Sequence, residues 1–209
     1  MTDITIRPAN ATDLDRIIAI ICDDPVPDLL AVEPRVERAR RIGAVTIRNG
    51  LDIDLARTVL AIVEGEAVGL LETSRPGETS SVSPLAMLRV LTQGMMISGP
   101  RVLASYVRHE RARSRVQVER PKDAYYIGEL DVHPQSRNRG IGARLMVHAE
   151  GEARAGGFAR MALTTGITNP AQHLYTRSGF HIAESRSDAA YERITGIPGR
   201  MLMVKDLAS

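Results

Sequence analysis

The segment from Tyr125 to Arg144, YYIGELDVHPQSRNRGIGAR, limits the possible folds of this chain more than any other. Its first half is rich in aromatic and β-branched residues, which predicts a strand, and Pro134 ends that strand because proline cannot donate a hydrogen bond to a sheet. Apolar residues then recur at helical spacing up to Ala153, which predicts a helix of about four turns that opens close to Gly140. The chain therefore places the start of a helix directly after the end of a strand.

Regular alternation along this strand predicts which side chains share a face. Two carboxylates, Glu129 and Asp131, would lie on the same face as Ile127. The other face would hold Gly128, Leu130 and Val132.

The turn between strand and helix suits the pyrophosphate of a ligand. The first amides of a helix have no partner inside it, and the helix dipole is positive at that end. Two arginines add positive charge, and glycines let the backbone approach phosphate oxygens. The residues concerned are Arg137, Asn138, Arg139, Gly140, Ile141 and Gly142. The dinucleotide fingerprint and the P-loop both need residues that this turn lacks. Taken alone, its glycines could equally serve a tight turn and close helix packing.

A second motif, from Asn169 to Phe180, follows another apolar strand, Met161 to Thr165. Pro170 suits the first position of a helix, and Asn169 suits its cap. Gly179 is expected to end that helix.

Together the two motifs resemble those of the GCN5-related N-acetyltransferase (GNAT) family. The R/Q-x-x-G-x-G/A turn of that family matches Arg137 to Gly142. Its N-x-x-A-x-x-x-Y-x-x-x-G-F pattern is similar to Asn169 to Phe180, with Ala171 one place earlier than in some members. The resemblance covers residues 3 to 75 and 122 to 207.

The resemblance implies acetyl-CoA as co-substrate. Backbone groups of the strand from Leu130 through Asp131 to Val132 would pair with the pantetheine arm as an added half-strand. Amides from Arg137 to Ala143 would hold the pyrophosphate, and Asn169 would lie beside the pantetheine.

The resemblance also implies the catalytic groups. Tyr175 would contact the cofactor and protonate the departing CoA thiolate, because a phenol is protonated at neutral pH. The alternative is that Tyr175 only packs the core with Leu174 and Phe180. Glu129 is the candidate base for deprotonating the incoming amine, since it lies on the cofactor strand just ahead of the turn. Alternatively, Glu129 and Asp131 are ordinary charges on a strand face.

Composition narrows the class of protein. The chain has 209 residues, of which 44% are hydrophobic, and this predicts a single domain over residues 1–209. A lone cysteine, Cys22, and a start without a signal-peptide pattern lead us to expect a cytoplasmic protein. The net charge of +2 favours neither nucleic acid nor membrane as a partner. The spacing of the five histidines and the cysteine predicts no metal site.

The remaining patterns predict an α/β fold of the GNAT type, with a mixed, mostly antiparallel β-sheet flanked by helices. We expect helices over residues 12–24 and 34–48 and a hairpin of strands 58–63 and 67–73. Further strands are expected near residues 125–133, 160–165, 179–184 and 200–206, and residues 185–199 are treated as a loop.

Residues 76–121 depart from short family members and are interpreted as a helical insert before the cofactor-binding strand. One helix is expected to begin at Ser83-Pro84 and run to Gly94, and a second to open at Gly99-Pro100. Three functions of the insert remain open: a lid over the acceptor pocket, which we favour, a homodimer face, and a basic patch for nucleic acid or an anionic substrate.

The sequence thus predicts an acyl-CoA-dependent N-acyltransferase that moves an acetyl group to a primary amine by direct attack. The acceptor, a small molecule or a peptide or protein amine, stays open. The alternatives are a CoA-binding regulatory or scaffold protein without turnover, and an enzyme that uses a longer acyl group or an alcohol acceptor.

Overall fold

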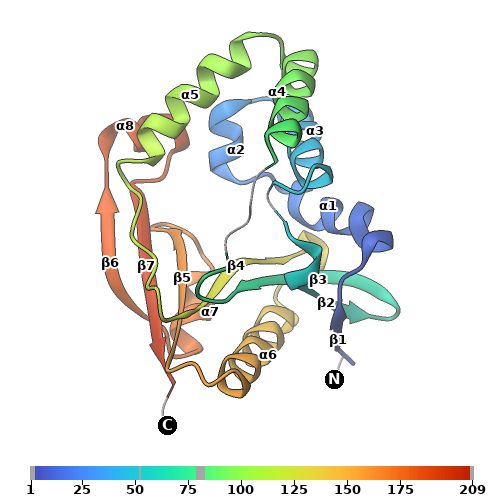
Figure 1. Ribbon diagram of the computed structural model, residues 1–209, viewed down its shortest axis with the longest axis vertical. Helices are drawn as coiled ribbons and strands as arrows, with labels where there is room; N and C mark the ends of the chain where they lie inside the picture. Colours follow the sequence, from blue (N-terminus) through green and yellow to red (C-terminus); the bar gives the residue numbers. More distant parts are fainter. Residues whose placement is uncertain (1–2, 52, 79–82, 208–209) are drawn as a thin grey trace.

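The computed structural model describes residues 3–51, 53–78 and 83–207, and the strands in these ranges form one seven-stranded sheet (Figure 1). The strand order is β1-β2-β3-β4-β5-β7-β6. Within the described residues β4 and β5 pair in parallel, and the other neighbours pair antiparallel. The strands are β1 Thr5–Pro8, β2 Thr58–Val63, β3 Glu66–Ser74, β4 Tyr125–Val132, β5 Arg160–Gly166, β6 His181–Ser187 and β7 Gly199–Asp206. The predicted mixed, mostly antiparallel sheet is therefore confirmed.

Helices cover both faces of the sheet (Figure 1). On one face, α6 (Ile141–Ala155) and α7 (Gln172–Arg177) pack on a core that includes Leu71, Ile127 and Leu163. On the other, α1 (Leu14–Cys22) and α3 (Val36–Arg48) contribute to a second core with side chains of β2 and β3. The sheet is thus buried on both sides where its central strands lie.

In the described residues between β3 and β4 the chain forms two helices, α4 (Pro84–Ser98) and α5 (Arg101–Arg113). Helix α4 runs through Gly94, where we expected its end, and stops at Gly99, which has a φ of 80°. Leu85 and Leu88 are more than half exposed, because α4 packs mainly on α3 and α5 through its other residues. Residues 79–82 of the predicted insert lie outside the described part of the chain.

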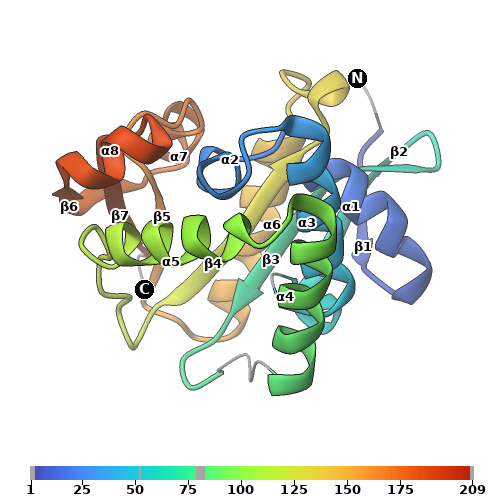
Figure 2. The ribbon, with the colours of Figure 1, turned by 90° about the horizontal axis from the view of Figure 1, so that it is seen from above.

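Figure 2 shows α5 lying over the sheet beside α8 (Ala189–Thr195) and α2 (Pro27–Val32). Neither of these two short helices was predicted. Pro27 occupies the first turn of α2, where a missing N–H is tolerated. Asp188 caps α8 through hydrogen bonds from the amides of Ala190 and Tyr191, and Gly196 ends it with a φ of 75°.

Candidate functional site

A β-bulge in β4 decides which way its side chains point. Glu72 on β3 is opposite Glu129, and the next residue, Thr73, is opposite Ile127, so Gly128 is an extra residue in β4. Such a residue reverses the alternation beyond it. Leu130 and Val132 consequently pack against the same core as Ile127.

This bulge corrects the predicted faces of the strand. Glu129 and Asp131 lie on the face opposite Ile127, toward the side of α1, rather than on the same face. Simple alternation failed here because it assumes that β4 and β3 pair without an inserted residue.

The outer edge of β4, defined here as the side facing away from β3 from Gly128 to Val132, lies where β4 and β5 separate. Their ladder joins Tyr125–Ile127 to Met161–Leu163, and no further pair between them occurs in the described residues. The amide of His133 donates to the carbonyl of Val68 on β3. Since backbone groups alternate in direction, those of Val132 and Leu130 point to the outer edge.

Side chains from nearby bind the outer edge at Val132. The Val132 amide donates to Asp131 Oδ1 at 2.9 Å, and Arg137 Nε donates to the Val132 carbonyl at 3.0 Å. The same guanidinium donates from Nη1 to Asp24 Oδ2 at 2.7 Å. Its Nη2 lies 3.8 Å from Asp131 Oδ1.

The turn after β4 leads directly into the N-terminus of α6, as predicted. Asn138 and Gly140 both have positive φ, 62° and 78°, and these values bend the chain into the helix. Gly142 serves a different need, because a Cβ atom there would lie 3.0 Å from Leu174 Cδ2 on the neighbouring helix α7. Four further residues of the turn and first helical turn are exposed: Arg137, Arg139, Ala143 and Arg144. This end of α6 can therefore offer amides and cations to an anion.

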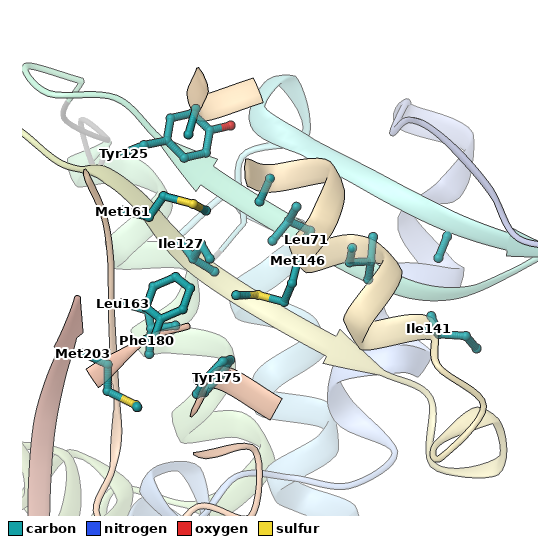
Figure 3. Close-up of a cluster of buried hydrophobic side chains, with 14 of the residues drawn as sticks. Leu71, Tyr125, Ile127, Ile141, Met146, Met161, Leu163, Tyr175, Phe180 and Met203 are labelled. Atoms are coloured by element: carbon teal, nitrogen blue, oxygen red, sulfur yellow. The ribbon is translucent and has the colours of Figure 1, made fainter. Parts of the chain in front are cut away.

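Tyr175 lies on α7, whose Leu174 lies close to Gly142 at the start of α6. Its side chain is buried, and its ring lies 6.4 Å from that of Phe180 (Figure 3). Burial raises the pKa of the phenol, and the negative charges of Glu129 and Asp131 raise it further. The hydroxyl therefore stays protonated at neutral pH. Tyr175 packs in the core, and the negative charges of Glu129 and Asp131 act on its hydroxyl.

Asn169 stabilises the turn that precedes α7. Its Nδ2 donates to Thr165 Oγ1 at 2.8 Å, and its Oδ1 accepts from the Ala171 amide at 2.9 Å. The helix begins at Gln172 rather than at Pro170, because the short-range bond between Asn169 and Ala171 forms a turn there. Asn169 is thus fixed at the end of β5, beside the separated strands.

The two carboxylates of β4 have different surroundings. Asp131 is 18% exposed, and burial raises its pKa to about 6. The Val132 amide and the Arg137 guanidinium oppose that rise by stabilising the carboxylate. Glu129 is half-buried, and its charge contributes more than that of Asp131 to the raised pKa of Tyr175.

A polar cluster that sequence reasoning missed lies on the opposite side of the sheet from α6. Asp28 Oδ1 lies 2.8 Å from His109 Nε2 and accepts a 2.8 Å hydrogen bond from the Tyr191 hydroxyl. Arg200 Nη1 lies 3.6 Å from Asp28 Oδ2. Burial would raise the pKa of Asp28, but the hydrogen bonds from His109 and Tyr191 outweigh it and lower the pKa. No local motif could have joined residues so far apart in the chain.

A cavity of about 650 Å³ lies between α5 and α8, and it contains none of the predicted site residues. Apolar side chains and arginines line it, namely Leu103, Ala104, Val107, Arg108, Arg111, Ala112, Arg115, Ala190, Arg193 and Ile194. The pocket is therefore separate from the β4 edge and its turn.

No group of three or more His, Cys, Asp or Glu side chains in the described part of the chain could hold a metal ion. None of the helices in the described ranges is both long and apolar enough to cross a membrane.

Comparison with known proteins matches the chain to one family. The model of the acetyltransferase (GNAT) family matches residues 37–180. No protein of curated description matches the sequence.

Solved structures that share the fold are distant in sequence. A crystal structure described as an acetyltransferase is 20% identical, with a TM-score of 0.55, and the match covers 98% of this chain and 100% of that one. An agmatine N-acetyltransferase mutant, S171A, is 17% identical, with a TM-score of 0.53 and coverage of 98% and 100%. The PaiA N-acetyltransferase of Thermoplasma acidophilum, in complex with coenzyme A, is 14% identical, with a TM-score of 0.54 and coverage of 98% and 99%.

Proposed function

Because the chain belongs to the acetyltransferase (GNAT) family and is by that membership an N-acetyltransferase, we propose that it moves an acetyl group from acetyl-CoA to a primary amine by direct attack. The observation that carries this proposal is the juxtaposition of the outer edge of β4, the α6 turn and the buried hydroxyl of Tyr175. Transfer from an acyl thioester of CoA requires a strand edge for the pantetheine arm, an anion site for the pyrophosphate and a proton donor for the departing thiolate.

The cofactor would bind along β4 and the turn. Backbone groups of Leu130 and Val132 would pair with the amides of the pantetheine arm, with Asp131 between them. The amides and side chains from Arg137 to Ala143 would bind the pyrophosphate, since the helix dipole and the arginines favour an anion there. Asn169, fixed at the end of β5, would lie beside the pantetheine arm.

Tyr175 would act as the general acid. Attack by an amine breaks the carbon–sulfur bond, and the thiolate that leaves must be protonated. The raised pKa of Tyr175 keeps its proton available at every pH at which the amine is reactive. Both negative carboxylates near it disfavour its ionised form, so the tyrosine can recover its proton between turnovers.

Glu129 would act as the base that takes the proton from the amine. It lies on the α1 side of β4, opposite the core face that holds Ile127, and its charge acts on Tyr175 more strongly than that of Asp131. The acid and base would therefore lie on either side of the reacting thioester. Asp131 has a different role, because its carboxylate binds the Val132 amide.

The amine would approach from the side of α1, α2 and α5, opposite α6. Helices α2, α5 and α8 meet there around Asp28, which supports our view of residues 76–121 as an insert within a single domain, forming a wall beside the acceptor. The lone buried Cys22 supports a reducing compartment, and we propose the cytoplasm.

The proposal is tested by release of CoA thiol from acetyl-CoA in the presence of amines. The panel should include agmatine, a free amino acid and a lysine peptide, because one structural neighbour is an agmatine N-acetyltransferase. We expect thiol release that needs both an amine and Tyr175. A protein that binds CoA in calorimetry but turns over none of these amines would instead support a regulatory or scaffold role.

A further inference from the structure

The turn from Arg137 to Ala143, proposed above to bind the pyrophosphate, is called the phosphate turn here. The guanidinium of Arg137 joins this turn to the end of α1. Its Nη1 donates to Asp24 Oδ2 at 2.7 Å, while its Nε donates to the Val132 carbonyl at 3.0 Å. Asp24 lies just beyond α1 and is 58% exposed, so it is anchored by this ion pair rather than by burial. We call Arg137, Asp24, Asp131 and Val132 the edge cluster.

The edge cluster uses the groups that a ligand on β4 would need. The amide of Val132 is bound by Asp131 and its carbonyl by Arg137, so both polar groups of this residue on the outer edge already have partners. Arg137 is also one of the two arginines of the phosphate turn. A CoA molecule that binds as proposed above must therefore compete with Asp24 and Asp131 for the same donors.

We propose that Asp24 is a positioning residue that lowers the affinity for CoA, because it holds Arg137 across the outer edge of β4. This inference rests on the proposed CoA site. Binding of the cofactor exchanges the carboxylate of Asp24 for a phosphate, and the Arg137 side chain then leaves the Val132 carbonyl. Asp24 lies outside both motifs described above, Arg137 to Gly142 and Asn169 to Phe180.

The exchange also changes the surroundings of Asp131. The charged and titratable groups that act on it are Arg137, Asp24 and His133, and it in turn acts on Tyr175. The Val132 amide and Arg137 both stabilise the carboxylate, and both are withdrawn when a ligand takes the outer edge. Asp131 therefore takes up a proton when CoA binds near neutral pH.

The affinity of CoA for the complete chain, measured by isothermal titration calorimetry, tests the role of Asp24. We expect Asp24→Asn to bind CoA about two- to fivefold more tightly, which is the range for loss of an exposed ion pair. Asp15→Asn is the matched control, because Asp15 forms an equally short 2.7 Å ion pair with Arg48 on α3. That control should leave the affinity unchanged.

The same substitution in the Arg137→Gln variant separates an effect exerted through Arg137 from a general effect of the lost negative charge. In Arg137→Gln, CoA should bind more weakly, and adding Asp24→Asn should then have no further effect. If Asp24→Asn tightens binding equally in both backgrounds, or in neither, the positioning role is wrong. Failure of the wild-type chain to bind CoA at all would instead contradict the proposed function.

Proton uptake is tested by repeating the titration at pH 7 in buffers of different ionisation enthalpy. The wild type should take up more protons per CoA than Asp131→Asn, and the difference isolates Asp131 because the ionisation of the CoA phosphates is common to both. Equal proton uptake by the two proteins would overturn the link between CoA binding and Asp131. Thermal unfolding of each variant verifies that it is folded.

Discussion

The hydroxyl of Tyr191 donates a 2.8 Å hydrogen bond to the carboxylate of Asp28, 163 positions earlier in the chain. His109 contacts the same oxygen from α5, so one carboxylate joins α2, α5 and α8. Tyr191 is fully buried. This contact ties a helix that lies between β3 and β4 to one helix early and one helix late in the described part of the chain.

We expect Tyr191→Phe to lower the free energy of unfolding by about 1 to 2 kcal/mol. The substitution removes a hydrogen bond to the charged Asp28 carboxylate, which then keeps only its contact with His109 at that oxygen. Urea unfolding measures the change. Tyr125→Phe is the matched control, since the Tyr125 hydroxyl donates to the neutral Thr73 hydroxyl at 2.9 Å. A loss in Tyr125→Phe as large as that in Tyr191→Phe would contradict the special role of the charged acceptor.

The raised pKa of Asp131 makes a prediction about stability and pH. A carboxyl group whose pKa rises from 3.8 to about 6 on folding binds protons more tightly in the native state. Its contribution to stability is therefore favourable at low pH and is lost as the pH rises from about 4 through 6. Asp131→Asn should then be more stable than the wild type at pH 7.5, by up to about 2 kcal/mol, and no more stable at pH 4.

Thermal unfolding of both proteins between pH 4 and 8 tests this dependence. Asp15→Asn, which removes an exposed carboxylate on α1, should follow the wild-type curve. A constant difference between wild type and Asp131→Asn across this pH range would show that Asp131 does not titrate there.

Tyr175→Phe removes the proposed acid and leaves the ring in the core. We expect kcat to fall by about 100-fold or more, which is the range for general acid catalysis, while the affinity for CoA changes little. Steady-state thiol release and CoA calorimetry measure the two quantities. Unchanged kcat would mean that Tyr175 only packs against Phe180 and its neighbours.

Gly140, at the N-cap of α6, and Gly151, within the helix, should respond to alanine in opposite directions. Gly140→Ala places a Cβ on a residue with a φ of 78°, and we expect a loss of about 1 kcal/mol in stability together with weaker CoA binding. Gly151→Ala lies in the same helix, is exposed and has no atom within 4 Å of the new Cβ. It should increase stability by about 0.5 to 1 kcal/mol and leave CoA binding unchanged. Thermal unfolding and CoA calorimetry separate the two effects.

Much of the fold was predictable because local patterns specify it. The hairpin of β2 and β3 turns at Glu64 and Gly65, both with positive φ, as its sequence suggested. The start of α6 near Gly140 was predicted from glycine and apolar spacing. The short helices α2 and α8 were missed, although Asp188 and Gly196 are a recognisable cap and stop for α8.

The sequence predicted which residues form the candidate site better than it predicted which way their side chains point. The turn motif includes Arg137, and the strand before it supplies Glu129 and Asp131. The face on which these two carboxylates lie depends on the bulge at Gly128, which forms only when β4 pairs with β3. Likewise, the contact between Arg137 and Asp24 spans 113 positions and leaves no local pattern. The pairing of β3 with β4 and the contact between Arg137 and Asp24 form only when the sheet assembles.

The sequence by itself determined that a strand, a glycine-containing turn and a helix follow one another from Tyr125, and that Tyr175 lies on a helix after a second strand. These are short-range consequences of proline, glycine and apolar spacing. Only the tertiary structure decided that Val132 is bound by Asp131 and Arg137, and that Asp28 gathers His109 and Tyr191. Burial and charge act through space, so the raised pKa of Asp131 and the contacts of Arg137 at the β4 edge exist only once the chain has folded.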